Sequence, residues 1–207
     1  MDSYTTIKAD ASDEFTEKRS RFIGYIHPAN SEEEALAFVA QIKKKHHDAK
    51  HNVYAYVLND GKLKYSEDGE PQGTAGVPVL SVLQKANVTN CVLVVTRYFG
   101  GILLGAGGLT RAYTHAATLA LEAADKITYC SHKTVRLACD YASYGFIEPL
   151  LSSLGTVLSS DFGEQIFLKA ALLPEDIGPV SEKLTEYSAG KLSLEIGEEI
   201  FLEKRKK

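Results

Sequence analysis

The chain has 207 residues, enough for one large or two small domains, and its 44% hydrophobic and 24% charged residues are typical of a folded soluble protein. Its formal net charge of −4 excludes the basic surplus of a general nucleic-acid-binding protein, so a nucleic-acid contact would require a local basic patch. No apolar run approaches the roughly 20 residues of a membrane span, the first residues lack the pattern of a signal peptide, and three cysteines without metal-ligand spacing indicate reduced thiols. We therefore expect a cytoplasmic protein that makes no membrane contact.

The first segment, which ends near residue 130, carries both strand and helix patterns. Ser31 is a predicted N-cap, because acidic residues follow it and Glu34 is placed for a capping box. Residues 59–62, Asn-Asp-Gly-Lys, are typical of a hairpin turn. The expected strands are 4–9, 22–26, 53–58, 63–65 and 91–96, and the expected helices are 32–45, a short helix opened by Pro78, and a long helix that ends near 124.

The second segment predicts the order β-α-β-β-α-β, which is the split βαβ or ferredoxin-like arrangement. The expected strands are 134–139, 156–161, 165–172 and 191–202, and the expected helices are 143–154 and 174–187. Pro149 and Pro179 fit these helices only if each helix begins later than drawn or is kinked. The predicted fold class is α+β, with one domain over residues 1–130 and a ferredoxin-like domain over 131–207.

A glycine-rich stretch at residues 97–111 (RYFGGILLGAGGLTR) lies between a predicted buried strand and a predicted helix. Its glycines expose backbone N–H groups, the helix start adds unpaired donors, and Arg97 and Arg111 add positive charge. It is not a P-loop, because Ala106 and Gly107 occupy the Lys and Ser/Thr positions, nor a dinucleotide-binding loop, because Thr110 occupies the last glycine position. Two interpretations stay open: an anion contact, or close packing of a helix on a sheet.

Other polar residues also have two interpretations. Four of them recur with helical spacing and either line a cleft or form the solvated face of a helix: Arg111, His115, Thr118 and Glu122. Asp68 and Glu70 either take part in acid–base or cation chemistry or belong to an exposed acidic turn. The candidate cleft residues are His51, Asp68, Glu70 and His115.

The sequence predicts neither a metal site nor a nucleophilic cysteine. His47 and His51 are four residues apart, but no third ligand is suitably spaced, so we expect no metal. Cys91 and Cys139 fall inside predicted strands and are expected to be inert core thiols.

Several unusual motifs occur in a fixed order: KRSRFIG at 18–24, AKHN at 49–52, SEDGEPQGTAG at 66–76 and RYFGG at 97–101, followed by the rest of the glycine-rich stretch. With these motifs the chain resembles the IMPACT family and, over nearly its whole length, the bacterial YigZ-type members. The resemblance implies a ribosomal-protein- and translation-factor-like β-α domain, followed by a ferredoxin-like domain similar to the last domain of elongation factor G. It also implies a link to translation. Eukaryotic IMPACT proteins tune the starvation control of translation through protein contacts, and bacterial members are suggested to bind nucleic acid or the ribosome.

Our leading hypothesis is a non-enzymatic, cytoplasmic regulator or accessory factor of translation that contacts RNA, the ribosome or a ribosome-associated protein and needs no cofactor. The alternative is an enzyme or sensor that binds a small phosphorylated ligand at the glycine-rich loop, and a third interpretation is a protein–protein adaptor. The candidate anion-binding or nucleic-acid-binding residues are Lys18, Arg19, Arg21, Arg97, Gly100, Gly101, Gly105, Gly107, Gly108, Thr110 and Arg111.

Overall fold

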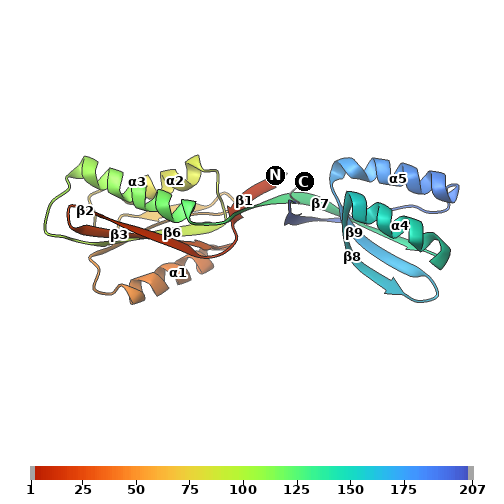
Figure 1. Ribbon diagram of the computed structural model, residues 1–207, viewed down its shortest axis with the longest axis horizontal. Coiled ribbons are helices and arrows are strands. Elements are labelled where there is room, and N and C mark those ends of the chain that lie inside the picture. Colours follow the sequence, from red (N-terminus) through yellow and green to blue (C-terminus); the bar gives the residue numbers. More distant parts are fainter. Residues whose placement is uncertain (1–2, 205–207) are drawn as a thin grey trace. The chain divides into compact units, whose positions relative to one another are not determined.

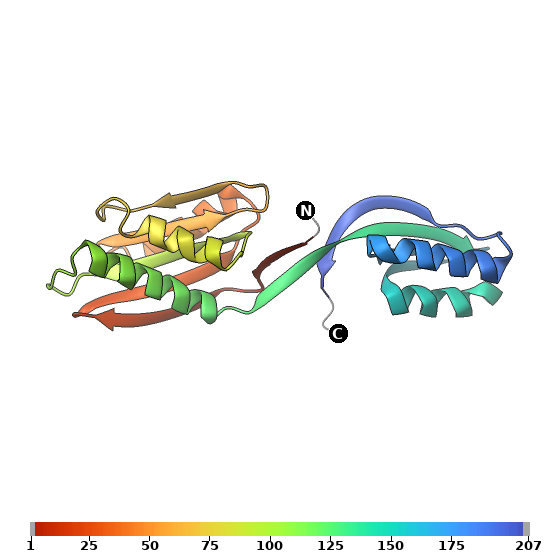
Figure 2. The same ribbon diagram turned by 90° about the horizontal axis from the view of Figure 1, so that it is seen from above.

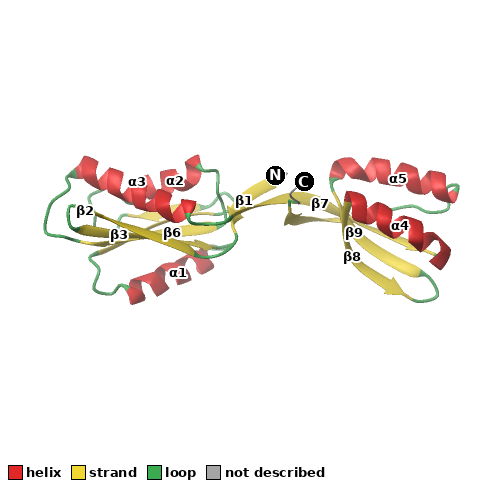
Figure 3. Cartoon of the chain, in the orientation of Figure 1, coloured by secondary structure: helices red, strands yellow, loops and turns green. Residues whose placement is uncertain are grey.

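The computed structural model describes residues 3–204, and the chain is divided into two compact units. The first unit spans Tyr4–Thr128 and the second begins at Tyr129. Each unit combines helices with antiparallel strands, so the architecture is α+β as predicted (Figure 3). Among the described residues, no helix has both the length and the apolar character needed to cross a membrane.

The first unit is built on a five-stranded antiparallel sheet in the order β2-β3-β6-β4-β5 (Figure 1). Helix α1 covers one face, and α2 and α3 cover the other; seen from above, the yellow α2 and the green α3 lie side by side across the sheet (Figure 2). The elements are β1 (Ser3–Ile7), β2 (Ala11–Glu17), β3 (Ser20–Pro28), α1 (Glu32–Lys45), β4 (His51–Val57), β5 (Leu63–Ser66), α2 (Gly76–Lys85), β6 (Cys91–Tyr98) and α3 (Ala106–Glu122).

The local signals of the first unit correspond to real features. The Ser31 hydroxyl accepts a hydrogen bond from the backbone N–H of Glu34 at 3.2 Å, which confirms the predicted N-cap of α1. Strand β6 is the central strand, and helices pack on both faces of the sheet, so its residues are buried on both sides and read as a continuous apolar run. Strand β2 was not predicted, because it is a largely exposed edge strand without an apolar alternation.

The strands of the second unit lie in the order β10-β7-β9-β8, and each of these neighbouring pairs is antiparallel. Strand β1 joins the same sheet beside the long strand β7, which makes five strands in all. Its core joins alternate residues of β7 and β9 to α4 and α5. The elements are β7 (Lys126–Cys139), α4 (Tyr141–Leu154), β8 (Gly155–Phe162), β9 (Ile166–Leu172), α5 (Pro174–Ser188) and β10 (Glu195–Glu203).

Two expectations for the second unit differ from the structure. Pro149 and Pro179 lie inside α4 and α5, so of the two alternatives, a later start or a kinked helix, the later start is wrong. Strand β7 begins at Lys126, well before the predicted residue 134, because its first half is only partly buried and lacks the apolar alternation of its second half.

Candidate nucleic-acid interface

The glycine-rich loop connects β6 to α3 and touches the β2–β3 turn. Gly105 precedes α3 with φ +72°, a conformation that favours glycine. Gly100 packs against the backbone of Arg19 so closely that a Cβ atom would lie 2.0 Å from the Arg19 carbonyl carbon. The backbone N–H of Gly100 also donates to the Ser20 hydroxyl at 3.1 Å. Gly101 is exposed in the loop, and the first turns of α3 contain Gly107, Gly108 and Thr110.

The β2–β3 turn places two basic side chains beside this loop. Glu17 pairs with Ser20, which leaves Lys18 and Arg19 as a two-residue turn with φ +45° and +66°. Both residues are exposed, and neither forms a salt bridge with a described residue. Arg21 differs, because its guanidinium contacts the Glu14 carboxylate at 2.6 Å.

The loop also exposes apolar side chains. Leu103 is 82% exposed and Phe99 45% exposed, and Ile102 is exposed as well. The Lys50 ammonium lies 5.9 Å from the Phe99 ring centroid, and the exposed Arg111 lies against Gly107 in the first turns of α3. We define the loop surface as Lys18, Arg19, Lys50, Phe99, Ile102, Leu103 and Arg111.

Arg97 lies in a buried polar network instead of on this surface. Its side chain is 6% exposed and that of Glu70 is 4% exposed, and Arg97 Nη1 lies 2.6 Å from Glu70 Oε1. The Tyr113 hydroxyl donates to the same oxygen at 2.8 Å, and His51 Nε2 lies 3.8 Å from it. Burial raises the pKa of Tyr113, so the phenol stays protonated and is a constant hydrogen-bond donor. The interpretation of Glu70 as part of an exposed acidic turn is wrong, because its charge is buried against Arg97.

The neighbouring acids hold the segment between β5 and α2 in place. The Asp68 carboxylate accepts hydrogen bonds from the Lys43 ammonium at 2.6 Å and from the backbone N–H of Asn52 at 2.7 Å. The Nδ1–H of His51 donates to the Asp68 carbonyl oxygen at 2.8 Å. The Glu67 carboxylate accepts N–H donors from Gly73, Ala75 and Gly76, at 2.9, 2.9 and 2.7 Å. These charges therefore stabilise a loop conformation.

The candidate cleft set is brought together only in part. His51, Asp68 and Glu70 belong to the network just described, whereas His115 is exposed on α3 and packs edge-on against Phe15, with ring centroids 4.6 Å apart. Arg111 and Glu122 of the polar stripe are exposed as well.

Two observations on residues 3–204 concern possible metal ligands and the Cys91 thiol. No group of three or more His, Cys, Asp or Glu side chains in this part of the chain is arranged to hold a metal ion. The Cys91 thiol is buried, and burial raises its pKa to about 12.

Of the residues on the loop surface, the sequence pattern had already included Lys18, Arg19 and Arg111 among the candidates, on the basis of their charge. Lys50 and the apolar loop residues were not among those candidates. An exposed Phe or Leu has the same sequence pattern as a buried one, and Lys50 lies near Phe99 only through the fold.

The chain matches two family models. The Impact N-terminal domain matches residues 18–121, and a domain of unknown function (DUF1949) matches residues 137–191. The first match includes the glycine-rich loop, the β2–β3 turn and the buried network.

Known relatives cover nearly the whole chain. The IMPACT family member YvyE of Bacillus subtilis is 39% identical over 99% of this chain and 95% of its own length. The IMPACT family member YigZ of Escherichia coli is 37% identical over 86% of this chain and 89% of its own length. Protein IMPACT of Mus musculus is 36% identical over 44% of this chain. A solved structure described as that of a hypothetical protein has a TM-score of 0.63 and 34% identity, and the match covers 96% of this chain and 98% of that chain. The chain therefore belongs to the IMPACT family and is similar over most of its length to the bacterial members.

Proposed function

We propose that this protein is a non-enzymatic factor linked to translation that contacts RNA on or off the ribosome through the loop surface. The link to translation comes from the family, since the chain shares its first unit with Protein IMPACT. The choice of RNA comes from the chemistry of the loop surface.

The observation that carries the proposal is the combination of free cations and exposed apolar side chains in one place. Lys18, Arg19, Lys50 and Arg111 form no salt bridge with another described residue, so their charges are available to phosphate groups. The exposed ring of Phe99 lies beside one of these cations and offers a stacking surface for an unpaired base. The chain as a whole is acidic, so the contact is local and sensitive to salt.

Arg97 has a positioning role in this proposal. Its guanidinium lies 5.4 Å from the Phe99 ring centroid and 5.5 Å from the Phe22 centroid while its charge is directed at Glu70. Arg97 therefore holds Phe99, at the start of the loop, in place. The alternative hypothesis, a small phosphorylated ligand at the glycine-rich loop, relies on the positive charges of both Arg97 and Arg111. Arg97 is not free for this role, because a phosphate bound to it would have to displace the buried carboxylate of Glu70.

Cosedimentation with ribosomes and titration of a labelled single-stranded oligoribonucleotide across a salt series test the proposal. The variant carries Lys18→Asn, Arg19→Gly and Arg111→Ala; Asn and Gly keep the positive φ of the turn. Each lost phosphate contact is expected to reduce the slope of log affinity against log salt by about 1. The matched control carries Lys85→Ala and Lys126→Ala, two exposed lysines elsewhere in the first unit, and should bind like the unmodified protein. Absence of binding at low salt, or equal binding by both variants, would refute the proposal.

A further inference from the structure

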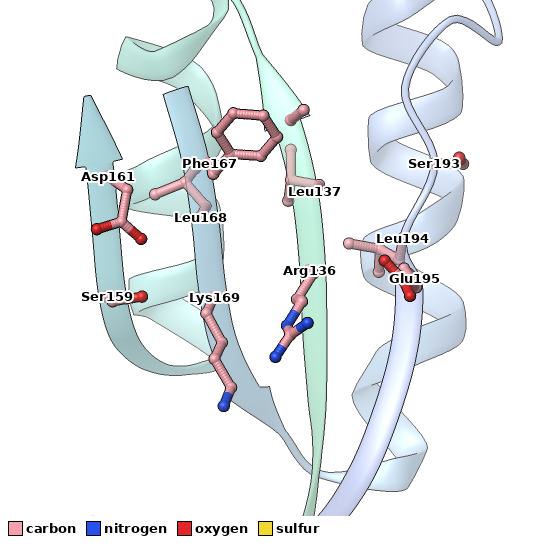
Figure 4. Close-up of a pocket in the computed structure, with 11 residues that line it drawn as sticks. Arg136, Leu137, Ser159, Asp161, Phe167, Leu168, Lys169, Ser193, Leu194 and Glu195 are labelled. Carbon is pink, nitrogen blue, oxygen red and sulfur yellow. The ribbon is translucent and has the colours of Figure 1, made fainter. Parts of the chain in front are cut away.

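The sheet of the second unit has one face that no helix of that unit covers. Val135 and Leu137 of β7 and Leu168 of β9 point toward α4 and α5. Because side chains alternate along a strand, Arg136 on β7 and Phe167 and Lys169 on β9 point to the opposite face. Figure 4 shows Arg136 beside Lys169 on neighbouring strands, with the ring of Phe167 further along β9.

Two positive charges face each other on this surface. Arg136 and Lys169 are direct cross-strand partners, and neither forms a salt bridge with another residue of the described chain. Like charges placed directly opposite destabilise a sheet. Glu195 of β10 is the other cross-strand partner of Arg136 and offsets part of this repulsion. Because no salt bridge within residues 3–204 holds either cation, both remain available to a phosphate group.

An aromatic ring stands beside the cation pair. Phe167 is 57% exposed and lies two residues from Lys169 on the same strand face. A hollow of about 820 Å³ extends along this face, and Ser159, Asp161 and Glu195 line it together with the basic pair and the ring. Asp161 is the cross-strand partner of Phe167, so its carboxylate is placed to accept a hydrogen bond from an amino group of a stacked base.

We propose that this face, formed by Arg136, Phe167 and Lys169 on the two central strands, binds single-stranded RNA. One base stacks on Phe167 and the neighbouring phosphate lies between Arg136 and Lys169. Exposed aromatic rings with cations beside them on the central strands of a β-sheet are the elements by which some RNA-binding folds recognise unpaired bases. Only the choice of RNA over another single strand rests on the proposed function, since the stacking ring and the charge pair stand without it.

Two acidic side chains limit where the phosphate backbone of the RNA can lie on this face. Asp161 and Glu195 flank the ring and the cation pair and repel a phosphate backbone on either side. The backbone is therefore confined to the row of Arg136 and Lys169. A duplex, whose bases are already stacked and whose phosphates lie on both sides, does not fit this arrangement.

The test is a titration of the full chain with a fluorescein-labelled single-stranded oligoribonucleotide. A length of about ten nucleotides lies within the roughly 4–16 nucleotides that one single-strand-binding OB fold covers. Phe167→Leu keeps an apolar side chain but removes the stacking ring, and should weaken binding between about fivefold and 150-fold. Phe167→Tyr keeps the ring and should bind like the unmodified protein. Arg136→Gln with Lys169→Gln should weaken binding and lower its salt dependence. The matched control carries Lys183→Gln and Lys191→Gln at two exposed positions of the second unit, and should bind like the unmodified protein.

The outcomes separate this inference from the proposed function. Weaker binding by Phe167→Leu and by Arg136→Gln with Lys169→Gln, with unchanged circular dichroism, supports the inference. This holds whether or not the variant of the loop surface, described under the proposed function, also binds weakly. Equal binding by Phe167→Leu and the unmodified protein overturns it, even where the loop-surface variant loses ribosome association. Competition by a mononucleotide as effective as the oligonucleotide, or equal binding of duplex RNA, overturns it as well.

Discussion

Replacement of Arg97 by alanine tests whether this arginine stabilises the fold or contacts a ligand. The substitution removes the cation 2.6 Å from Glu70 Oε1 and leaves a carboxylate whose side chain is 4% exposed. Removing one partner of a buried ion pair costs about 3–5 kcal/mol, because the other charge remains desolvated. A domain is stable by about 5–15 kcal/mol, so this loss is a large fraction of the free energy of unfolding. Arg111→Ala removes an exposed charge on α3 and should change that free energy by less than about 0.5 kcal/mol.

Urea unfolding followed by circular dichroism and tyrosine fluorescence measures this difference, since the chain has 11 Tyr and no Trp. The double variant Arg97→Met with Glu70→Met removes both charges, so we expect it to be more stable than Arg97→Ala. An unfolding midpoint of Arg97→Ala equal to that of Arg111→Ala would refute the reasoning. The same result would return Arg97 to the set of candidate ligand contacts.

Three further perturbations follow from the loop, its neighbouring turn and the core. Lys18→Asn with Arg19→Gly should raise the free energy of unfolding by about 1 kcal/mol, because Asn and Gly adopt positive φ at lower cost; a thermal midpoint that does not rise contradicts this. Gly100→Ala should lower stability by about 1–3 kcal/mol or more, since its Cβ would overlap the Arg19 backbone, and an unchanged denaturant midpoint would show that the loop has room for the methyl group. With a pKa raised to about 12, Cys91 stays a thiol at pH 8. A thiolate-selective reagent should label the partly exposed Cys130 first and Cys91 only on addition of denaturant; equal labelling rates would contradict the burial of Cys91.

Local signals were sufficient for many of the elements. The N-cap at Ser31 and the hairpin turn at residues 59–62 are short-range features, and the structure has α1 and the β4–β5 hairpin at these places. Strand β2 and the first half of β7 were not predicted, because an exposed or partly buried strand has no strong alternation of apolar residues in its sequence.

For the candidate interface too, some features follow from the sequence and others only from the tertiary structure. The sequence by itself determined the family, the α+β class, the glycine-rich loop and the basic residues Lys18, Arg19 and Arg111. Only the tertiary structure decided which charges are free. Arg97 and Arg111 are equivalent in the sequence, but β6 places Arg97 against Glu70, 27 residues away along the chain, whereas α3 leaves Arg111 exposed. Burial and charge pairing depend on contacts between distant segments, and a linear pattern contains no information on which distant carboxylate a buried cation meets.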